Sequence, residues 1–314
     1  MPLSADLDEG QVIVRTEYSG ISAGTELLAF RGQLDPELPL DETIGSLAGT
    51  FRYPFRYGYS CAGRVERSWG RLAEGTLVVA LHPHQDRFVL REDEVIVLEG
   101  DDDARVATLF PLVETALQIC LDAGEALCEH VVVVGLGVVG ILTASLLQRS
   151  GASVIAAEPK AWRRRAAASF GIRAVGPDQL ADEVNECTGG RGVPLLIELS
   201  GQPAALAGGL ALLAHEGSAL VASWYGTKDV SLPLGGAFHR RRLSLRSTQV
   251  STIPARLGSR WTVGRRRALA RDLLKELPVG RLATHEFPLG QAQAAFDAID
   301  RQDEELLHVA LRHG

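Results

Sequence analysis

Short apolar runs rich in β-branched residues make up much of the first hundred positions. Glycine or acidic residues bound them, which is typical of strands in a β-rich domain. The runs are QVIVRTEYSG (11–20), GTLVVALH (75–82), RFVLRED (87–93) and EVIVLEG (94–100). The stretch YPFRYGYSCAGRV (53–65), with its glycines and tyrosines, is predicted to be a turn where polar side chains converge.

The spacing of apolar residues then becomes helical. Leucine and valine recur every four residues over ATLFPLVETALQICLDAG (107–124), and Gly124 ends the predicted helix. The next run, HVVVVGLG (130–137), is continuously apolar, as in a strand buried on both faces of a parallel sheet. Further strands are predicted at 153–158, 193–201, 218–226 and 243–250, with helices at 138–149, 162–170 and 204–214 between them. This alternation predicts βαβ units in a doubly wound sheet.

The tail returns to a mixed texture. Helices are expected near 261–276 and 290–302, followed by a last strand over LLHVALR (306–312). The chain is therefore expected to have an α/β fold in three parts. A β-rich domain spans 1–116, a dinucleotide-type α/β domain spans 117–251, and a segment over 252–314 returns to the first domain.

Composition narrows the class of protein. The 314 residues are 46% hydrophobic, enough to fill two cores, and the net charge of −7 argues against nucleic acid or an acidic membrane as partner. Arginine clusters at 163–165, 240–242 and 265–267 are expected to be solvated faces. The four cysteines form no C-x-x-C pair, and neither a signal core at the N-terminus nor a membrane-length apolar run is seen. A soluble, reduced, cytoplasmic protein is expected.

A glycine motif carries the strongest functional signal. Gly135-x-Gly137-x-x-Gly140 directly follows a buried strand and opens a helix. In that context the first glycine permits the tight turn, the second admits a pyrophosphate and the third lets helix and strand pack closely. The N–H groups of Val138 and Val139 in the first helical turn would face the phosphates. The alternative is a glycine-rich turn in a sheet that binds no nucleotide.

The residue after the next strand bears on the choice of dinucleotide. Glu158 lies 18 positions beyond Gly140 and can accept hydrogen bonds from ribose hydroxyls. Its charge would repel a 2′-phosphate, so NAD is expected. Lys160, Arg163 and Arg164 follow closely and could pair with that phosphate, which keeps NADP open.

Five segments carry a resemblance to a known family. They are SGISAGTELL (19–28), RYGYSCAGRV (56–65), VETALQ (113–118), VVVVGLGVVG (131–140) and FPLGQAQAAFDAID (287–300). Over nearly its whole length the chain resembles the medium-chain dehydrogenase/reductase superfamily, and within it a zinc-independent branch named bacteriochlorophyllide dehydrogenase-like. The resemblance implies a GroES-like catalytic domain followed by a Rossmann domain.

Departures from the zinc-dependent members of that family fall at the ligand positions. Where those relatives have Gly-Ile-Cys, this chain has Ser22, and where they have His-Glu after a glycine it has Tyr59 and Ser60. Pro111 stands near the place of a third ligand. Hydroxyl groups bind zinc poorly, so the resemblance implies a site that works without zinc.

Without a metal, a side chain must polarise the substrate oxygen. Tyr59 is the first candidate, because it stands in place of a ligand imidazole; a core tyrosine packed beside Tyr57 is the alternative. Glu114, on an otherwise apolar helix, is a second candidate, with a structural ion pair as its alternative. The complete set of catalytic candidates is Tyr59, Glu114, His84 and Ser22.

Substrate and cofactor contacts are expected from neighbouring positions. The substrate candidates are Thr25, Glu26, Ser60 and His82, with a loop histidine as the alternative for the HPHQDRF segment. Residues at the carboxyl ends of two strands, where ligands gather in such sheets, are expected to contact the cofactor, as is Thr115. The strand-end residues are Ser200, Gly201, Ser223, Trp224 and Tyr225, although the two aromatic residues could simply be core.

These expectations converge on a zinc-independent NAD(P)-dependent oxidoreductase. Its substrate would be a small secondary alcohol or ketone, and the hydroxyl-rich set suits a polyhydroxylated ring such as a cyclitol. One alternative is an NADPH-dependent ene or quinone reductase, and another is a dinucleotide-binding protein without turnover. A homodimer is expected, joined through the edge strand near 243–250.

Overall fold

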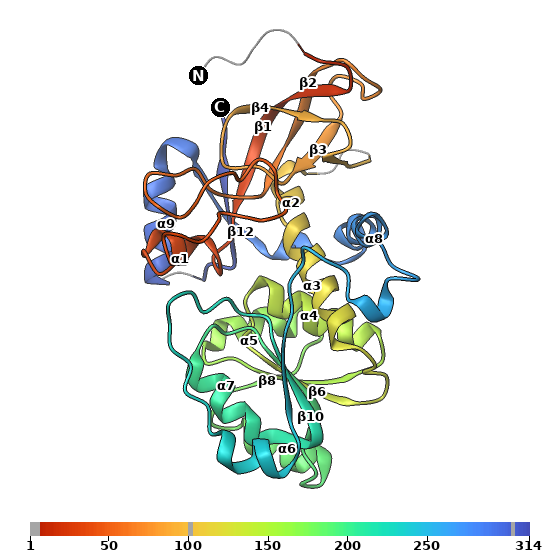
Figure 1. Cartoon of the computed structure of the whole chain (residues 1–314), viewed down its shortest axis with the longest axis vertical. Coiled ribbons are helices and arrows are strands. Elements are labelled where there is room, and N and C mark those ends of the chain that lie inside the picture. Colours follow the sequence, from red (N-terminus) through yellow and green to blue (C-terminus); the bar gives the residue numbers. More distant parts are fainter. Residues whose placement is uncertain (1–6, 100–102, 303–304) are drawn as a thin grey trace. The chain divides into compact units, whose positions relative to one another are not determined.

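The structure is a computed structural model that describes residues 7–99, 103–302 and 305–314. Residues 1–6, part of the segment searched for a signal core, lie outside the described residues. The chain divides into two compact units (Figure 1). The first comprises Met1–Pro111 and Arg267–Gly314, and the second comprises Leu112–Arg266. The C-terminal segment thus joins the first unit from Arg267, later in the chain than the expected boundary at 252.

The described part of the first unit is built on a seven-stranded sheet. Its strands run in the order β12-β13-β1-β2-β3-β5, with β4 paired to β1. They are β1 (Gln11–Ile21), β2 (Cys61–Ser68), β3 (Leu77–Ala80), β4 (Arg87–Arg91), β5 (Val95–Val97), β12 (Ala283–Pro288) and β13 (His308–Arg312). The pairing of β13 with β1 is antiparallel, with Tyr18 opposite Arg312 and Ile21 opposite Val309. This pairing brings the C-terminal residues beside the first strand of the chain.

Short helices cover this sheet. They are α1 (Glu26–Phe30), α2 (Ala104–Ala107) and α9 (Ala292–Arg301), with 3-10 turns η4 (Val279–Arg281) and η5 (Leu289–Gln291). Ile21 and Leu27 pack with Ala295 and Ile299 in one apolar cluster. A second cluster around Leu47 and Phe51 includes the half-buried rings of the 53–60 segment. These clusters fix the loops that carry the predicted catalytic residues.

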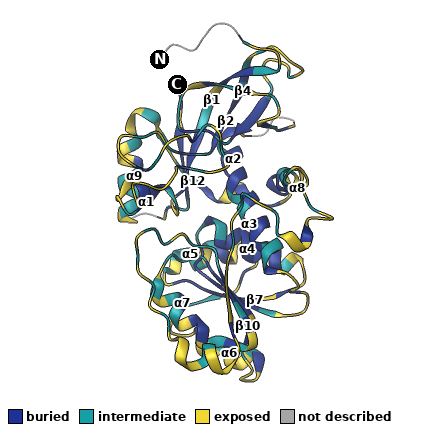
Figure 2. Cartoon of the chain, in the orientation of Figure 1, coloured by how far each residue is buried: buried dark blue, intermediate teal, exposed yellow. Residues whose placement is uncertain are grey.

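The second unit contains a six-stranded parallel sheet. Its order is β11-β10-β9-β6-β7-β8. The strands are β6 (His130–Val134), β7 (Ser153–Ala157), β8 (Ala174–Val175), β9 (Val193–Glu198), β10 (Leu213–Val221) and β11 (Ser244–Ser247). Helices α4 (Val138–Arg149), α5 (Ala161–Ala168), α6 (Leu180–Thr188) and α7 (Pro203–Gly209) connect them, with shorter turns η1 (Leu210–Leu212), η2 (Leu234–Phe238) and η3 (Ala255–Leu257). Figure 2 shows the central strands buried, as their continuous apolar runs predict.

Two longer helices contain the boundaries between the units. They are α3 (Phe110–Ala123) and α8 (Val263–Glu276). Among the described residues, one helical segment, Ala104–Ala123, is long and apolar enough to cross a membrane by length and composition. This corrects the expectation that no apolar run approaches such a length. The structure buries 67% of that window, as expected of a core helix.

The predicted α/β class, with a β-rich sheet and a Rossmann sheet, is confirmed. The predicted turn at 53–65 is only partly correct, because β2 begins at Cys61 within it. The charged residues of β2 face outward and pair across the sheet, as Arg64 does with Glu17. The helix predicted to 214 ends at Gly209, and β10 starts at Leu213. Helices α1 and α6 and strand β12 were not predicted.

The four cysteines are free and differ in exposure. Cys61 is buried and Cys128 is exposed, while Cys120 and Cys187 are intermediate. Burial raises the pKa of the Cys61 and Cys120 thiols to about 12. Neither of these two thiols is therefore ionised near neutral pH.

Candidate active site

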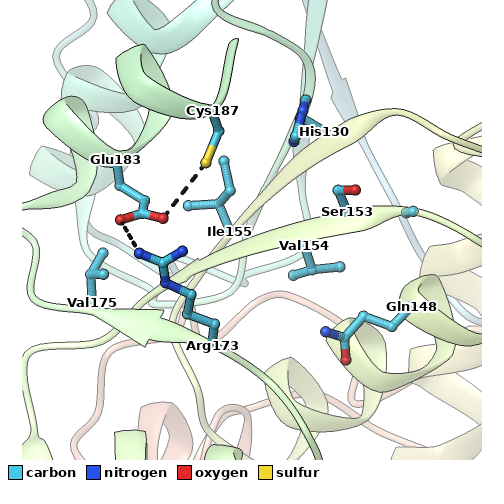
Figure 3. Close-up of a pocket in the computed structure, with 10 residues that line it drawn as sticks. His130, Gln148, Ser153, Val154, Ile155, Arg173, Val175, Glu183 and Cys187 are labelled. Carbon is cyan, nitrogen blue, oxygen red and sulfur yellow. Dashed lines mark hydrogen bonds and ion pairs between the residues drawn. The ribbon is translucent and has the colours of Figure 1, made fainter.

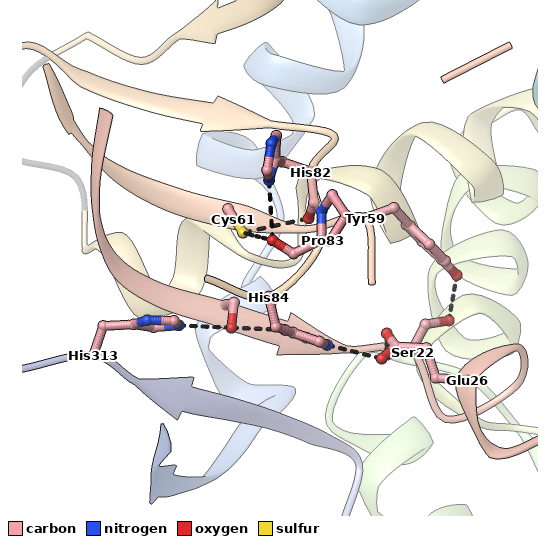
Figure 4. A network of polar contacts seen from close by, with 9 residues as sticks. Ser22, Glu26, Tyr59, Cys61, His82, Pro83, His84 and His313 are labelled. Atoms are coloured by element: carbon pink, nitrogen blue, oxygen red, sulfur yellow. Dashed lines mark hydrogen bonds and ion pairs between the residues drawn. The ribbon is translucent and has the colours of Figure 1, made fainter. Parts of the chain in front are cut away.

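Tyr59 and Ser22 contact each other in the first unit. The Tyr59 phenol donates a hydrogen bond to Ser22 Oγ at 2.5 Å (Figure 4). Burial raises the pKa of Tyr59 to about 12, against the opposing effect of hydrogen bonds with Ser22 and Thr25. The phenol therefore stays protonated at neutral pH and is a hydrogen-bond donor. Two positions that hold zinc ligands in the resembling family are thus bonded to each other.

Gly58 makes this geometry sterically feasible. Its φ of +105° is a conformation that glycine adopts readily, and a Cβ there would lie 2.6 Å from Cδ2 of His84. The glycine therefore both turns the chain toward Tyr59 and admits the His84 ring. The Tyr57 and Tyr59 rings pack edge to face, 6.3 Å apart, so the aromatic packing weighed for Tyr59 coexists with its polar contact.

Glu26 and His84 lie beside this pair. Glu26 is 3% exposed at the start of α1, and its Oε1 accepts a hydrogen bond from the Ser22 N–H at 2.7 Å. Its Oε2 lies 2.8 Å from His84 Nε2. Thr25 is the N-cap residue of the same helix. Three separate segments of the sequence thus bring four polar side chains together. They are Ser22 and Glu26 from the loop 22–26, Tyr59, and His84.

Three residues extend this network that were not anticipated from the sequence. His84 Nδ1 lies 2.7 Å from Ser19 Oγ, which lies 2.9 Å from His313 Nε2. His313 Nδ1 in turn lies 2.9 Å from Asp86 Oδ1. The only sequence signal was the alternation HPHQD at 82–86. The contribution of residue 313 depends on the pairing of β13 with β1.

Ser60 and His82, two of the substrate candidates, bond to backbone carbonyls. Ser60 Oγ donates to Thr108 O at 2.7 Å, and both residues are buried. His82 Nδ1 lies 3.0 Å from Pro83 O, and its ring stacks on Phe88 with 4.0 Å between centroids. Burial lowers the pKa of His82. These contacts are those of a satisfied loop histidine, the alternative that the sequence left open.

Glu114 forms a buried ion pair in the second unit. Arg266 donates from Nε and Nη2 to Glu114 Oε1 at 3.0 and 2.9 Å, and from Nη1 to Gln118 Oε1 at 2.5 Å. Arg266 is only 2% exposed. The expectation that the arginine cluster at 265–267 is a solvated face is therefore wrong for this residue. Thr115, the next residue on α3, is half-buried.

The glycine loop of the second unit has the geometry of a phosphate cradle. Gly135 has a φ of +96°, and a Cβ on Gly140 would lie 2.0 Å from Gly135 O. A Cβ on Gly137 would meet nothing within 4 Å, and no side chain in the described part of the chain caps α4 there. The N–H groups of Val138, Val139 and Gly140 are therefore available to an anion. These residues fit the pyrophosphate of a dinucleotide.

Glu158 lies against this loop, 3% exposed. Its Oε2 accepts from the Leu136 N–H at 2.9 Å and its Oε1 from the Lys160 N–H at 3.0 Å. Arg163 Nη1 lies 3.9 Å from the carboxylate, and Arg164 donates to the Glu158 carbonyl oxygen at 2.6 Å. Burial lowers the pKa of Arg163, while Glu158 opposes that effect. A carboxylate and two arginines thus lie at the carboxyl end of β7, and the choice between NAD and NADP stays a prediction.

A buried carboxylate organises the carboxyl end of β9. Glu198 is fully buried, and its Oε1 accepts from the N–H and hydroxyl of Ser200 at 2.6 and 2.5 Å and from the Gly201 N–H at 3.1 Å. Its Oε2 accepts from the Tyr225 hydroxyl at 2.8 Å, and Ser223 Oγ accepts from the Gly201 N–H at 2.9 Å. Four of the predicted strand-end residues therefore lie together around Glu198, which was not among the candidates, and their contact with a cofactor stays a prediction. A carboxylate ending an apolar strand was the available signal.

Trp224 lies between two members of this cluster in sequence and is 40% exposed. The reading of this residue as a buried core aromatic is therefore not supported. Tyr225 is half-buried, and burial raises its pKa, with the bond to Glu198 adding to the effect. The two neighbouring aromatic residues thus differ in their surroundings.

The donor groups at the family's ligand positions do not fit zinc. Ser22, Tyr59 and Ser60 supply hydroxyl groups, and Ser60 is engaged with a carbonyl oxygen. Across residues 7–99, 103–302 and 305–314, no group of three or more His, Cys, Asp and Glu side chains could hold a metal ion.

A cavity of about 420 Å³ lies elsewhere in the second unit (Figure 3). His130 and Ser153, the first residues of β6 and β7, line it, so it lies at the amino end of the sheet, whereas the glycine loop follows the carboxyl end. Arg173 and Glu183 form an ion pair of 2.9 Å on its wall. None of the predicted site residues lines this cavity.

Part of the chain is similar in sequence to known dehydrogenases. Residues 138–260 match the family described as zinc-binding dehydrogenase. Over 123 residues, 38% of this chain and 35% of the relative, the sequence is 31% identical to L-threonine 3-dehydrogenase from Bacillus velezensis. Over 102 residues, 31% of this chain and 29% of the relative, it is 39% identical to D-guloside 3-dehydrogenase from Escherichia coli. The chain thus matches about a third of the length of these curated relatives.

Solved structures resemble the chain over nearly its whole length. 2R,3R-butanediol dehydrogenase from Bacillus subtilis has a TM-score of 0.78 at 18% identity, covering 99% of this chain and 95% of that one. An alcohol dehydrogenase from Thermotoga maritima has a TM-score of 0.79 at 19% identity, covering 99% of this chain and 94% of that one. CurK enoyl reductase has a TM-score of 0.75 at 19% identity, covering 100% of this chain and 94% of that one. Residues 138–260 are therefore similar to zinc-binding dehydrogenases, and the chain has the fold of these solved structures.

Proposed function

We propose that the chain is a zinc-independent NAD(P)-dependent oxidoreductase acting on a secondary alcohol or ketone. The observation that carries the proposal is the Tyr59–Ser22 hydrogen bond beside Glu26 and His84. It provides a protonated donor for a substrate oxygen at positions where the family has metal ligands. The matched relatives, named as dehydrogenases of threonine and a guloside, support the same reaction class.

The second unit would hold the dinucleotide. Gly137, Val138, Val139 and Gly140 would receive its pyrophosphate, and Glu158 would lie toward the adenosine ribose. When bound, the nicotinamide supplies the hydride acceptor or donor. We infer a preference for NAD, because two backbone N–H groups hold the Glu158 carboxylate in place, where it would repel a 2′-phosphate.

The first unit would handle the oxygen and its proton. Tyr59 is protonated because its pKa is near 12. On substrate binding its hydroxyl hydrogen would turn from Ser22 Oγ to the substrate oxygen and stabilise negative charge that develops there, while the Ser22 hydroxyl would donate to the phenol oxygen. Ser22 orients the phenol, and Glu26 and His84 are the nearby groups that can exchange a proton. We do not assign Glu114 to this chemistry, because Arg266 engages its Oε1 within the second unit.

A substrate rich in hydroxyl groups suits this site. We propose a polyhydroxylated ring such as a cyclitol, because Ser22, Tyr59, Glu26 and His84 offer both donors and acceptors. The test incubates the purified protein with NAD+ or NADP+ and a panel of polyols, and follows the reduced cofactor. Turnover should survive removal of metal ions by a chelator.

The matched variants are Tyr59→Phe and Tyr57→Phe. The first removes the proposed donor hydroxyl and should lower turnover by about 10²- to 10⁴-fold, the usual contribution of a general acid or base. The second alters a neighbouring ring that makes no part of the proposed donor pair and should leave turnover within a few-fold. Stoichiometric zinc in active protein, or equal activity in both variants, would contradict the proposal.

The same assay separates the remaining functions. Consumption of enones with NADPH, with alcohols ignored, would favour an ene or quinone reductase. Dinucleotide binding without turnover on either substrate class would favour a non-catalytic binding protein.

The homodimer remains a proposal of its own. Strand β11 is at the edge of the sheet and all four of its residues are exposed, which supports pairing between two copies there. Light scattering on the eluting protein would measure the mass directly.

A further inference from the structure

Five side chains of the first unit form a continuous row of hydrogen bonds. The bonds run from Glu26 to His84 (2.8 Å), on to Ser19 (2.7 Å), to His313 (2.9 Å) and to Asp86 (2.9 Å). Figure 4 shows the part from His313 through His84 to Glu26. The Glu26 side chain is 3% exposed and that of His313 is 0% exposed, whereas that of Asp86 is 69% exposed. The row therefore leads from a buried carboxylate to a solvated one.

The fold brings these residues together from separate segments. Ser19 belongs to β1, and the pairing of β13 with β1 sets Leu311 opposite Ser19. The backbone N–H of His313 donates to Glu17 O at 2.9 Å, so the pairing with β1 extends to residue 313. This holds the His313 ring against Ser19. His84 approaches from the loop after β3, where Gly58 leaves room for its ring.

Counting protons shows what such a row can do. Four hydrogen bonds need four protons, while one serine hydroxyl and two neutral imidazoles supply three. With every bond made, the row therefore holds one further proton. At one end that proton is on Glu26 and at the other His313 is an imidazolium, with a His84 imidazolium as the arrangement between them. The two end arrangements differ by one proton shift along each of the three bonds between Glu26 and His313, and they have the same net charge.

We infer that this row is a proton relay between the buried site and solvent. The inference rests on the proposed function. In alcohol oxidation a bound nicotinamide would supply the acceptor for the hydride of the C–H bond, and the hydroxyl proton would pass to Glu26. The three protons of the row shift by one bond each, and His313 releases its Nδ1 proton to Asp86 and water. Ketone reduction runs the same transfers in reverse.

The electrostatics of His313 suit a group that passes its proton on. Burial lowers its pKa, Asp86 raises it and His84 lowers it. The imidazolium is thus disfavoured by burial but stabilised on the side that faces the exposed carboxylate. A structural tether that only fixes β13 would need no such path to the surface.

Ser19→Ala tests the relay by interrupting the row without removing either imidazole. Thr16→Val is the matched control, because Thr16 lies on the same strand and its hydroxyl bonds to Gln85 O, outside the row. Nuclear magnetic resonance of the ring nitrogens follows the titration of His313 in the complete chain, without substrate. In the native and Thr16→Val backgrounds, Glu26→Gln should shift the His313 titration by about one pH unit. In the Ser19→Ala background the shift should vanish.

Activity supplies the second measurement. Ser19→Ala should lower turnover by roughly 10- to 100-fold with little change in KM, and Ser19→Thr, which keeps the hydroxyl, should restore it. Added imidazole should restore turnover of His313→Ala. The relay would be overturned if Glu26→Gln shifted the His313 titration equally with and without the Ser19 hydroxyl. It would also be overturned by a loss of turnover that neither Ser19→Thr nor imidazole restores. The resonance result decides the relay even if no substrate is turned over, so the two proposals can fail separately.

Discussion

The two proposed sites are built by different means. In the second unit the groups that we propose bind a ligand are backbone N–H groups of one loop, between two elements adjacent in the sequence. In the first unit they are side chains from distant segments, and Ser19 and His313, which are in contact, are 294 positions apart. A local sequence pattern can therefore identify the site of the second unit, whereas the site of the first unit depends on the tertiary structure.

The largest effect is expected from filling the glycine cradle. Gly140→Val should abolish measurable dinucleotide binding, because even a Cβ would lie 2.0 Å from Gly135 O and the helix would have to move away from the loop. Titration of the protein with NAD+ measures this.

Gly208→Ala is the control for that variant, since a Cβ at that position of α7 meets nothing within 4 Å. It should bind NAD+ as the native protein does. Tight binding by Gly140→Val would show that the backbone cradle is not where the second unit binds its ligand.

The buried ion pair of the second unit should affect stability more than chemistry. Arg266→Leu leaves the Glu114 carboxylate buried without its cation and should cost about 3–5 kcal/mol of unfolding free energy. The double variant Arg266→Leu, Glu114→Leu should recover most of that loss. Denaturant unfolding at neutral pH measures both, and equal losses in the single and double variants would contradict an ion-pair role.

Stability should depend on pH through a histidine of the first unit that is outside the relay. Burial lowers the pKa of His308 to about 4, below its ordinary 6.5. Between those values the unfolded chain binds the proton more readily than the native one, so stability is full above about pH 6.5 and falls as the pH falls toward 4. The loss from this residue is about 3 kcal/mol. His308→Gln should flatten the dependence on pH measured by denaturant unfolding, while the exposed His215→Gln should not.

The smallest effect concerns cofactor choice. Glu158→Gln keeps an acceptor for the Leu136 N–H but removes the charge, so the ratio of NADP+ to NAD+ affinity should rise roughly 10-fold, as the loss of about 1.4 kcal/mol of repulsion would give. Paired binding titrations measure the ratio. Glu129→Gln, at an exposed position of the same unit, should leave it unchanged.

Much of the second unit could be predicted from the sequence because its cues are local. The continuous apolar run of β6 and the glycines after it lie within eleven positions, and the helix predicted over 138–149 matches α4. The resemblance to the medium-chain dehydrogenases is supported by the family match over 138–260 and by the fold, while the zinc-independent branch stays a prediction. Helix α6 was missed because its polar composition lacks a strong apolar period.

The first unit was less predictable because its contacts are long-range. Tyr59 and Ser22 could be singled out, but not their mutual hydrogen bond, which spans 37 positions. In the second unit, the burial of Arg266 escaped prediction for the same reason. Which arginine of the cluster 265–267 faces inward depends on the orientation of α8 and on Glu114, 152 positions away.

The unequal exposure of the four thiols gives an experimenter a ready labelling site. Cys128 is exposed, whereas burial keeps Cys61 and Cys120 protonated and out of reach of a maleimide reagent. The half-buried Cys187 has a raised pKa, because of burial and the neighbouring Glu183, to which its thiol donates a hydrogen bond. A fluorophore added in slight excess should attach at Cys128 in the second unit. The emission of that fluorophore would then report on the second unit, and no engineered cysteine would be needed.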